Sequence, residues 1–391
     1  MATPRLYFDD PLLATFESTV VAHGEHGGRS TVVLERTAFY PESGGQMADR
    51  GTLDGVPITD VQVDDADVVH HLLNGPLPPQ GASVRGEIDV PRRRVHMALH
   101  TAQHMLSRAF VDLLDAETVS ARLGETECTI DLARPTLSDA ELGAAEDLVH
   151  AVIDDDRPIR AFIATPEELA GLALRRAPKV DHDVRIVDID GFDLSPCGGT
   201  HCLRTAQVGV LRIKGVERYK GKSRVTFAAG RRARLELAGE ARVLGVLAQE
   251  LTCSPADVAA AFEKLRRELG AARDERKRTL ARLADSIAAE LIARPGNELV
   301  AIFDGLGSEF LRALGARVIG TRADAVAFFA DRAEEHLSVF VARGEKSSFD
   351  CGAFLKRVAA ETGGRGGGRA QHGEARLTRE TDWEALVRKH G

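Results

Sequence analysis

Two short motifs place residue types that bind metal ions at a suggestive spacing. His100 and His104 lie in a stretch with helical periodicity, and residues four apart in a helix lie on one face with β-carbons about 5–6 Å apart. Far downstream, Cys197 and His201 flank Gly-Gly-Thr, and glycine tolerates the tight turn that would bring a thiolate and an imidazole together. Three nitrogens and one sulfur suit tetrahedral Zn²⁺. The sequence therefore predicts a zinc site built from two distant segments.

Other metal-binding residue types lie beside these motifs. His96 continues the histidine row by one helical turn, too far from His104 for all three to share an ion, so we expect it to support the site from outside or to face solvent. Cys202 adjoins the second motif, but His201 fits the pair spacing better. We interpret Asp181-His-Asp183 as a solvated turn.

The elements that must position these residues differ along the chain. Residues 1 to about 90 contain short, partly alternating apolar segments, such as 31–35 and 58–63, between glycine- and proline-rich turns, which indicates a small barrel or sandwich. Helical periodicity follows over 92–114, and Ser138-Asp-Ala-Glu141 begins a second helix to 153 as a capping box. Further strands are predicted over 184–189, 208–213 and 223–228.

The C-terminal part begins with a long helix. Ser254 is expected to cap it and Pro255 suits its first position. Apolar residues then recur every three or four positions up to Pro295, as in a coiled coil. Packing against a neighbouring domain and self-association both explain this stripe. Predicted strands over 298–302, 317–321 and 338–342 alternate with helical stretches, and a glycine cluster covers 363–369.

These patterns predict an α+β protein in four parts. They are a small β-barrel domain with a glycine-rich motif over 1–90, a zinc-binding domain with an antiparallel sheet and helices over 91–236, a helical linker over 237–295, and a small glycine-rich α/β domain over 296–391. A homodimer would form through the long helix or the C-terminal domain.

Composition and charge limit the class of protein. Of 391 residues 43% are hydrophobic, and no run reaches the roughly 20 apolar residues of a membrane helix. The start of the chain lacks a signal-peptide pattern and the five cysteines are scattered, so we expect a cytoplasmic protein without membrane contact.

The segment 204–234 is strongly basic, with Glu217 as its one acidic residue, although the whole chain has a net charge of −8. It is a candidate for contacts with RNA phosphates. A pair of solvated strands is the alternative. The candidate RNA-binding residues are Arg212, Lys214, Arg218, Lys220, Lys222 and Arg224.

Three motifs in this order resemble the editing domain of alanyl-tRNA synthetases and the freestanding AlaX-type editing proteins. They are Phe39-Tyr-Pro-Glu-Ser-Gly-Gly-Gln46, His100-Thr-Ala-Gln-His104 and Cys197-Gly-Gly-Thr-His201. The long helix and the glycine cluster resemble the C-terminal extension of the same synthetases. After the glycine cluster, the sequence continues as Ala370-Gln-His-Gly-Glu374, which departs from the family pattern. This departure makes tRNA binding by that domain less secure.

The resemblance implies a hydrolase that removes serine, and secondarily glycine, from mischarged alanine tRNA, with Zn²⁺ bound by His100, His104, Cys197 and His201. By position in the family pattern, Thr37 is the candidate for holding the serine hydroxyl and Gln46 a second catalytic residue. Ser43, Gly44, Gly45 and Gln46 would approach the substrate. With three protein ligands zinc could activate water, and with four it would mainly position the substrate or support the pocket.

Three alternatives remain beside this function. Threonyl-tRNA synthetase editing domains have similar zinc pairs, which leaves a mischarged threonine-system tRNA as a rival substrate. A non-catalytic tRNA-binding protein with a structural zinc would keep the same ligands. A phosphodiesterase would require an aspartate- and histidine-rich metal domain, and the sequence contains no such cluster.

Overall fold

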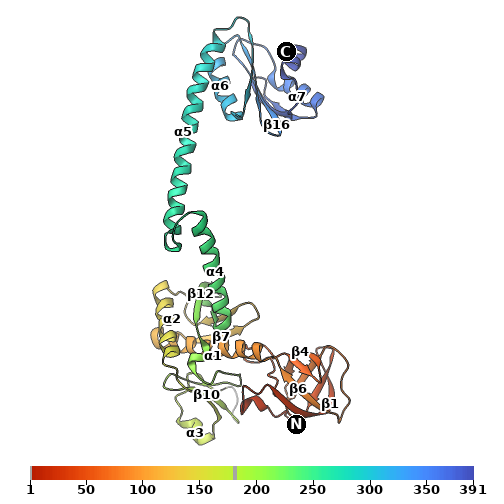
Figure 1. Ribbon diagram of the computed structural model, residues 1–391, viewed down its shortest axis with the longest axis vertical. Helices are drawn as coiled ribbons and strands as arrows, with labels where there is room; N and C mark the ends of the chain where they lie inside the picture. The colour runs from red at the N-terminus through yellow and green to blue at the C-terminus, as the bar shows by residue number, and fades with distance from the viewer. Residues whose placement is uncertain (1, 179–182) are drawn as a thin grey trace. The chain divides into compact units, whose positions relative to one another are not determined.

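The computed structural model describes residues 2–178 and 183–391, in two compact units, Met1–Gly245 and Val246–Gly391 (Figure 1). Asp181 and His182 of the predicted solvated turn lie outside the described residues. Within the described part, no helix is long and apolar enough to cross a membrane. The four-part division remains a prediction.

The first unit begins with a closed six-stranded barrel, so the barrel and not the sandwich is correct. Around the barrel the order is β1-β2-β5-β4-β3-β6. The strands are β1 (Thr15–His26), β2 (Arg29–Leu34), β3 (Gly51–Leu53), β4 (Val56–Val63), β5 (Val69–Leu73) and β6 (Ser83–Ile88). Strand β6 alternates between exposed and buried side chains along its length, as expected for one face turned into a barrel.

Helix α1 (Val90–Leu114) follows the barrel and confirms the predicted helix. The side chain of Asp89 caps it by accepting from the backbone N–H of Arg92, and Pro91 occupies its first turn. Its apolar face joins one core with α2 (Asp139–Asp154) and the sheets of this unit. The predicted Ser138–Glu141 capping box is present at the start of α2.

Two antiparallel sheets lie beside α1. One has the order β12-β13-β8-β7 and the other β11-β10-β9. Their strands are β7 (Thr118–Leu123), β8 (Cys128–Leu132), β9 (Ile159–Ile163), β10 (Arg185–Ile189), β11 (Asp193–Pro196), β12 (Leu211–Tyr219) and β13 (Lys222–Ala229). Helix α3 (Pro166–Gly171) follows β9. The strand predicted over 208–213 is displaced, because Thr205–Val208 form a 3-10 turn that ends at Gly209 with φ of 68°.

Helix α4 (Gly230–Glu250) directly follows β13. Most of it lies within the helical linker predicted over 237–295, although that range begins seven residues after the helix does. Large apolar side chains of α4 are exposed, including Leu235, Val243 and Leu247. A helix without a clean buried stripe gives little periodic signal, so the pattern did not show where α4 begins.

In the second unit, α5 (Val258–Ile292) is the predicted long helix, but it starts three residues after the predicted first position, Pro255. Pro255–Asp257 form a 3-10 turn, and the Ser254 hydroxyl donates to the Asp257 carboxylate at 2.6 Å instead of capping the backbone. Ala284, Ala288 and Leu291 near its end are buried in a core with α6 (Ser308–Thr321). A homodimer through α5 or the C-terminal domain stays a prediction.

A five-stranded sheet of order β14-β15-β16-β18-β17 forms the rest of this unit. Only β14 and β15 pair in parallel. The strands are β14 (Glu298–Asp304), β15 (Val326–Arg332), β16 (His336–Arg343), β17 (Arg365–Gly368) and β18 (His372–Thr378), with helices α7 (Cys351–Thr362) and α8 (Trp383–His390). The strand predicted over 317–321 is wrong, because these residues end α6. Val318 continues the buried stripe of Phe310, Leu311 and Leu314 at helical spacing.

Candidate metal centre

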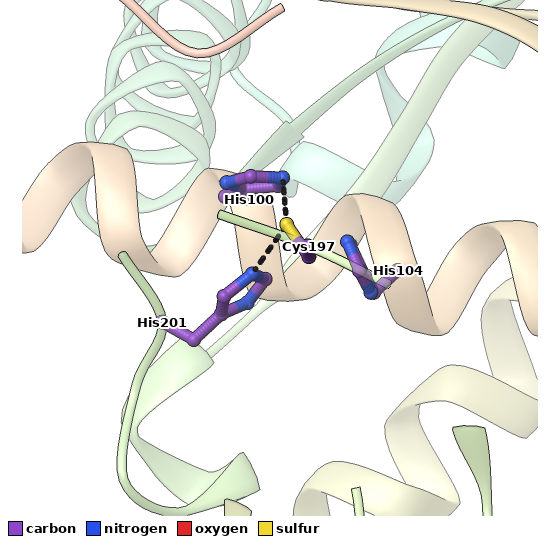
Figure 2. A group of neighbouring side chains, drawn as sticks. All are labelled: His100, His104, Cys197 and His201. Atoms are coloured by element: carbon purple, nitrogen blue, oxygen red, sulfur yellow. Dashed lines mark hydrogen bonds between the residues drawn. The ribbon is translucent and has the colours of Figure 1, made fainter. Parts of the chain in front are cut away.

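His100, His104, Cys197 and His201 converge at one buried point, as the sequence predicted (Figure 2). One ligand atom from each side chain lies within 4.8 Å of the others. The Cys197 Sγ is 3.5 Å from His100 Nε2 and 3.3 Å from His201 Nε2. Helix α1 supplies two imidazoles, and residues 197–201, which we name the metal-binding turn, follow β11 and supply the other two ligands.

Each imidazole is held through its Nδ1 atom by a side chain outside the cluster. His100 Nδ1 lies 2.6 Å from Gln46 Oε1, His104 Nδ1 lies 3.2 Å from Asp193 Oδ2, and His201 Nδ1 lies 3.2 Å from Thr101 Oγ1. Metal-binding histidines characteristically donate their other ring N–H to such oxygens, which fixes the tautomer and the ring orientation. With Nδ1 engaged, the three Nε2 lone pairs are free to face a shared ion.

The protonation states of the cluster also suit a cation. Burial lowers the pKa of His201 to about 3 and lowers that of His100, so both rings are neutral near pH 7. Burial raises the pKa of the Cys197 thiol, but the surrounding imidazoles hold that pKa well below its ordinary value. For His104, burial is outweighed by Cys197 and Asp193, and its pKa rises. Neutral imidazoles around a thiolate are the forms that bind Zn²⁺. His100, His201 and Cys197 favour these forms, and His104 would release its proton on binding, so the donor set fits this ion.

Gly199 of the metal-binding turn packs directly against a ligand. A β-carbon at this position would lie 2.1 Å from His100 Cε1, whereas one at Gly198 would meet nothing within 4 Å. Only the second glycine of the motif is therefore required by packing.

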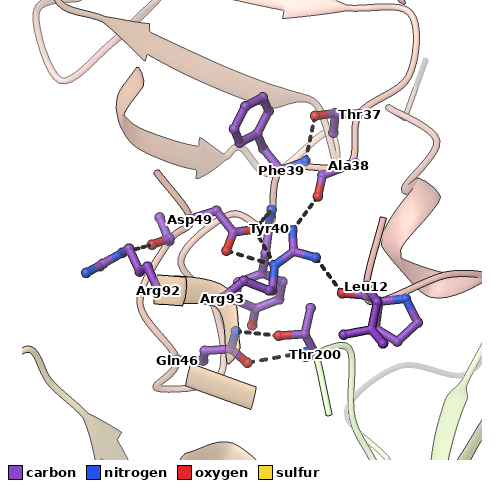
Figure 3. Close-up of polar contacts among 12 residues, drawn as sticks. Leu12, Thr37, Ala38, Phe39, Tyr40, Gln46, Asp49, Arg92, Arg93 and Thr200 are labelled. Carbon is purple, nitrogen blue, oxygen red and sulfur yellow. Dashed lines mark hydrogen bonds and ion pairs between the residues drawn. The ribbon is translucent and has the colours of Figure 1, made fainter. Parts of the chain in front are cut away.

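Gln46 connects the metal-binding turn to residues 43–46, which we name the glycine loop (Figure 3). Its Oε1 lies against His100 Nδ1 and its Nε2 donates to Thr200 Oγ1 at 2.8 Å. The side chain is fully buried, while Ser43 and Gly44 are exposed at the tip of the loop. Gly45 has φ of +88°, and a β-carbon there would lie 2.5 Å from a backbone oxygen of Ala121.

Thr37 is fully buried in the barrel and its hydroxyl has two partners. Its oxygen lies 2.8 Å from His71 Nε2 and accepts from the backbone N–H of Phe39 at 3.1 Å. His71 Nδ1 donates to the Val32 carbonyl at 3.0 Å, and burial lowers the pKa of His71 to about 4. The neutral ring thus presents a bare Nε2, and Thr37 donates its proton to it.

A buried ion pair joins the barrel to α1 (Figure 3). Arg93 Nε lies 2.9 Å from both carboxylate oxygens of Asp49, and its Nη2 donates to the Ala38 carbonyl at 2.6 Å. Asp49 Oδ2 also accepts from the backbone N–H of Tyr40 at 2.7 Å. These bonds fix the segment that contains Thr37 and the glycine loop against the helix that carries two metal ligands.

The six candidate tRNA-binding residues all lie on the β12–β13 hairpin. Three are in salt bridges, which are Arg212 with Glu240, Lys214 with Glu236, and Arg224 with Asp131. Arg218, Lys220 and Lys222 surround the hairpin tip and form no salt bridge with any residue that the structure describes. These three are the cations available to a phosphate.

A cavity of about 590 Å³ lies beside the hairpin tip. Its lining includes Gly45, Met47, residues of the β7–β8 hairpin, Tyr219 and Arg224, together with the carboxylates of Glu42, Glu125, Glu127, Asp131 and Glu217. The cavity therefore connects the basic hairpin with the glycine loop.

The structure also places His96 and Cys202, the two other metal-binding residue types beside the motifs. His96 is buried at 2% exposure and lies outside the cluster, so the prediction that it faces solvent is wrong. Cys202 is also buried outside the cluster, as expected, and its backbone N–H donates to Thr101 Oγ1.

The sequence analysis missed the residues that hold the ligands. Thr101 lies inside the 100–104 motif, between its two histidines, but the motif does not reveal its contact with His201. Asp193 and Arg185 belong to no motif and lie in the paired strands β11 and β10, of which β11 leads into the metal-binding turn.

The chain is similar in sequence to aminoacyl-tRNA synthetase domains and to an alanyl-tRNA editing protein. Residues 9–92 match the family described as tRNA synthetases class II (A), and residues 184–226 match the threonyl and alanyl tRNA synthetase second additional domain. The chain is 32% identical over 237 residues to the alanyl-tRNA editing protein AlaX-L of Pyrococcus horikoshii, covering 59% of this chain and 58% of that protein.

Alanine–tRNA ligases are similar over different lengths. The ligase of Korarchaeum cryptofilum is 29% identical over 97% of this chain and 44% of its own length. The ligase of Thermofilum pendens is 35% identical over 58% of this chain and 26% of its own length. The chain thus spans less than two thirds of each of these relatives.

Proposed function

Because the chain is related to alanine–tRNA ligases and resembles AlaX-type editing proteins, we propose that it is a zinc-dependent hydrolase that removes serine, and secondarily glycine, from mischarged alanine tRNA. The observation that carries the proposal is the buried cluster of His100, His104, Cys197 and His201, with every imidazole Nδ1 held by a protein group. The cytoplasm is the expected location.

These four residues would hold the zinc ion. Bound there, Zn²⁺ would supply Lewis-acid chemistry at the ester carbonyl or at a water molecule. Gln46 keeps the Nε2 of His100 directed into the cluster through its contact with His100 Nδ1. The exposed tip of the glycine loop, Ser43 and Gly44, offers its backbone to the substrate.

We assign the preference of the proposed hydrolase for serine over alanine to Thr37. A hydroxyl has one proton and two acceptor positions. Thr37 uses its proton on His71 and one acceptor position on Phe39, which leaves one acceptor position for the hydroxyl of a serine. Alanine has no such hydroxyl, and a site built for a hydrogen bond discriminates more strongly than an apolar pocket does.

The tRNA would approach over the β12–β13 hairpin. Arg218, Lys220 and Lys222 would contact acceptor-stem phosphates, which position a nucleic acid without reading its sequence.

A deacylation assay tests this function. We expect hydrolysis of alanine tRNA charged with serine, slower hydrolysis of the glycine ester, and little of the correct alanine ester. Threonine tRNA charged with serine or threonine is included as the rival substrate. Hydrolysis of only the threonine-system tRNA, or of no ester at all, would refute the proposal.

Removal of a metal ligand tests the role of zinc. Cys197→Ala should lose bound zinc and about 10²-fold or more of the deacylation rate, since even partners of the ligands contribute 10–100-fold. Cys202→Ala is the matched control, because this neighbouring thiol is buried outside the cluster. Zinc content is measured by elemental analysis, and full activity of zinc-free Cys197→Ala would exclude a catalytic metal site.

A further inference from the structure

Arg185 belongs to no sequence motif, but it is hydrogen-bonded to the metal-binding turn. It is the first residue of β10 and is only 7% exposed. Its Nη1 donates to the backbone carbonyls of Cys197 and Gly199, each at 2.9 Å. Its own carbonyl accepts from the backbone N–H of Cys197 at 2.9 Å. One residue thus makes three hydrogen bonds to the turn.

We propose that Arg185 is a positioning residue that sets the geometry of the metal centre by fixing the backbone of the metal-binding turn. The two carbonyls that it binds bracket Gly198, where the absence of any neighbour within 4 Å of a β-carbon leaves the turn without side-chain support. Hydrogen bonds from a charged donor are shorter and stronger than neutral ones. Functional groups need to be held within about 0.5 Å of their working position, and the guanidinium supplies this constraint.

The turn has little freedom on its other side. Gly199 lies against the ring of His100, because a β-carbon there would clash with it, and Thr200 is bound to Gln46. A shift of the turn would therefore move Cys197 and His201 and press on a third ligand. The two hydrogen bonds from the Arg185 guanidinium oppose such a shift of the turn.

Arg185 is itself held by the N-terminal segment. Its guanidinium carbon lies 4.8 Å from the centre of the Phe8 ring. Phe8 packs edge-on against Tyr7 at 5.1 Å, and Tyr7 packs against Tyr40 at 5.4 Å. The hydroxyl of Tyr40 donates to the Ser43 carbonyl in the glycine loop. A row of rings therefore links Arg185 with the loop on the far side of the site.

The first test replaces the guanidinium. Arg185→Met keeps an apolar stem and the backbone bond to Cys197 but loses both side-chain hydrogen bonds to the turn, and Arg185→Lys keeps the charge but cannot donate from a planar fork. We expect zinc affinity, measured by competition with a chelator, to fall about 10–100-fold in Arg185→Met and less in Arg185→Lys. The thiolate-to-cobalt absorption band of the Co²⁺-substituted protein should shift or weaken in the same order.

Arg176→Met is the matched control. Its Nη2 donates at 3.0 Å to the carbonyl of Pro196, next to the turn, but its side chain is exposed. It should keep the zinc affinity and the cobalt spectrum of the wild type. Phe8→Leu provides a milder variant, because it removes the ring beneath the guanidinium and no hydrogen bond of the turn. We expect a few-fold loss of affinity in the same direction.

Folding and function are separated by two further measurements. Urea unfolding of the metal-free variants shows whether each protein is folded, and metal binding is measured without tRNA. The catalytic consequence rests on the proposed function, with kcat expected to fall and KM to stay unchanged. A wild type that binds zinc but deacylates nothing would refute that function and leave the role of Arg185 standing.

The proposal fails if folded Arg185→Met binds zinc with wild-type affinity and an unchanged cobalt spectrum. It also fails if Arg176→Met weakens the metal as much, because the effect would then follow from loss of positive charge near the turn.

Discussion

At the scale of single residues, Thr37 has the sharpest test, because the barrel contains a second threonine of the same kind. Thr31 is also fully buried, and its Oγ1 lies 2.9 Å from His70 Nδ1. Both threonines thus contact a histidine of β5, but only Thr37 belongs to the segment that leads into the glycine loop.

Replacement of each threonine by valine should separate stability from selectivity. Thr37→Val leaves His71 Nε2 without its donor, and an unsatisfied buried group costs about 1–3 kcal/mol. Thr31→Val should cost a similar amount in urea unfolding. Only Thr37→Val should also reduce the preference for serine over alanine esters, measured as the ratio of kcat/KM. Equal ratios in Thr37→Val and Thr31→Val would remove Thr37 from the discriminating role.

Single residues also differ in how well they could be predicted. The four ligands were found because their side chains have distinctive chemistry and a spacing that brings each pair together. Groups that orient them include ordinary residues far away in the chain, such as Asp193, which lies 89 positions after its partner His104. Such contacts follow from tertiary packing, which no local pattern encodes.

At the scale of elements, the docking of α1 on the barrel depends on the Arg93–Asp49 pair, in which each residue is 1% exposed. Arg93→Met should lower the free energy of unfolding by about 3–5 kcal/mol, because it leaves a buried carboxylate without its partner. Arg108→Met on the same helix is the control. Its pair with Asp112 is partly exposed, and we expect a change below about 1 kcal/mol.

Urea unfolding followed by circular dichroism measures both variants. If Arg93→Met and Arg108→Met have the same midpoint and slope, the buried pair does not hold α1 to the barrel. A loss confined to Arg93→Met would show that the helix with two ligands depends on a contact made in the barrel.

Elements with a clear period were predicted well, and the errors have a common cause. Segments 31–35 and 58–63 located the barrel strands β2 and β4, and the helical period located α1 and α2, the latter with its capping box. Residues 317–321 were assigned to a strand because Val318 and Ile319 form a short β-branched run, which does not distinguish a strand from a buried helix. Packing of α6 against the sheet and α5 decided in favour of the helix.

At the scale of the whole molecule, the chain is acidic while its proposed ligand is a polyanion. Binding then depends on where positive charge is available and not on the net charge of −8. On the β12–β13 hairpin, neighbouring carboxylates already neutralise Arg212 and Lys214, whereas Lys220 and Lys222 at the tip have no salt bridge among the described residues. The two pairs differ in availability although they belong to one hairpin.

Salt dependence of tRNA binding distinguishes these two pairs. Each phosphate contact contributes about 0.7–0.9 to the slope of log K against log salt concentration. Lys220→Ala with Lys222→Ala should therefore make the slope shallower by about 1.4–1.8. Arg212→Ala with Lys214→Ala should change it by much less, because Glu240 and Glu236 already compensate those charges. Binding of alanine tRNA measured between about 50 and 200 mM salt gives both slopes, and equal changes in the two double variants would show that the hairpin tip is not the phosphate contact.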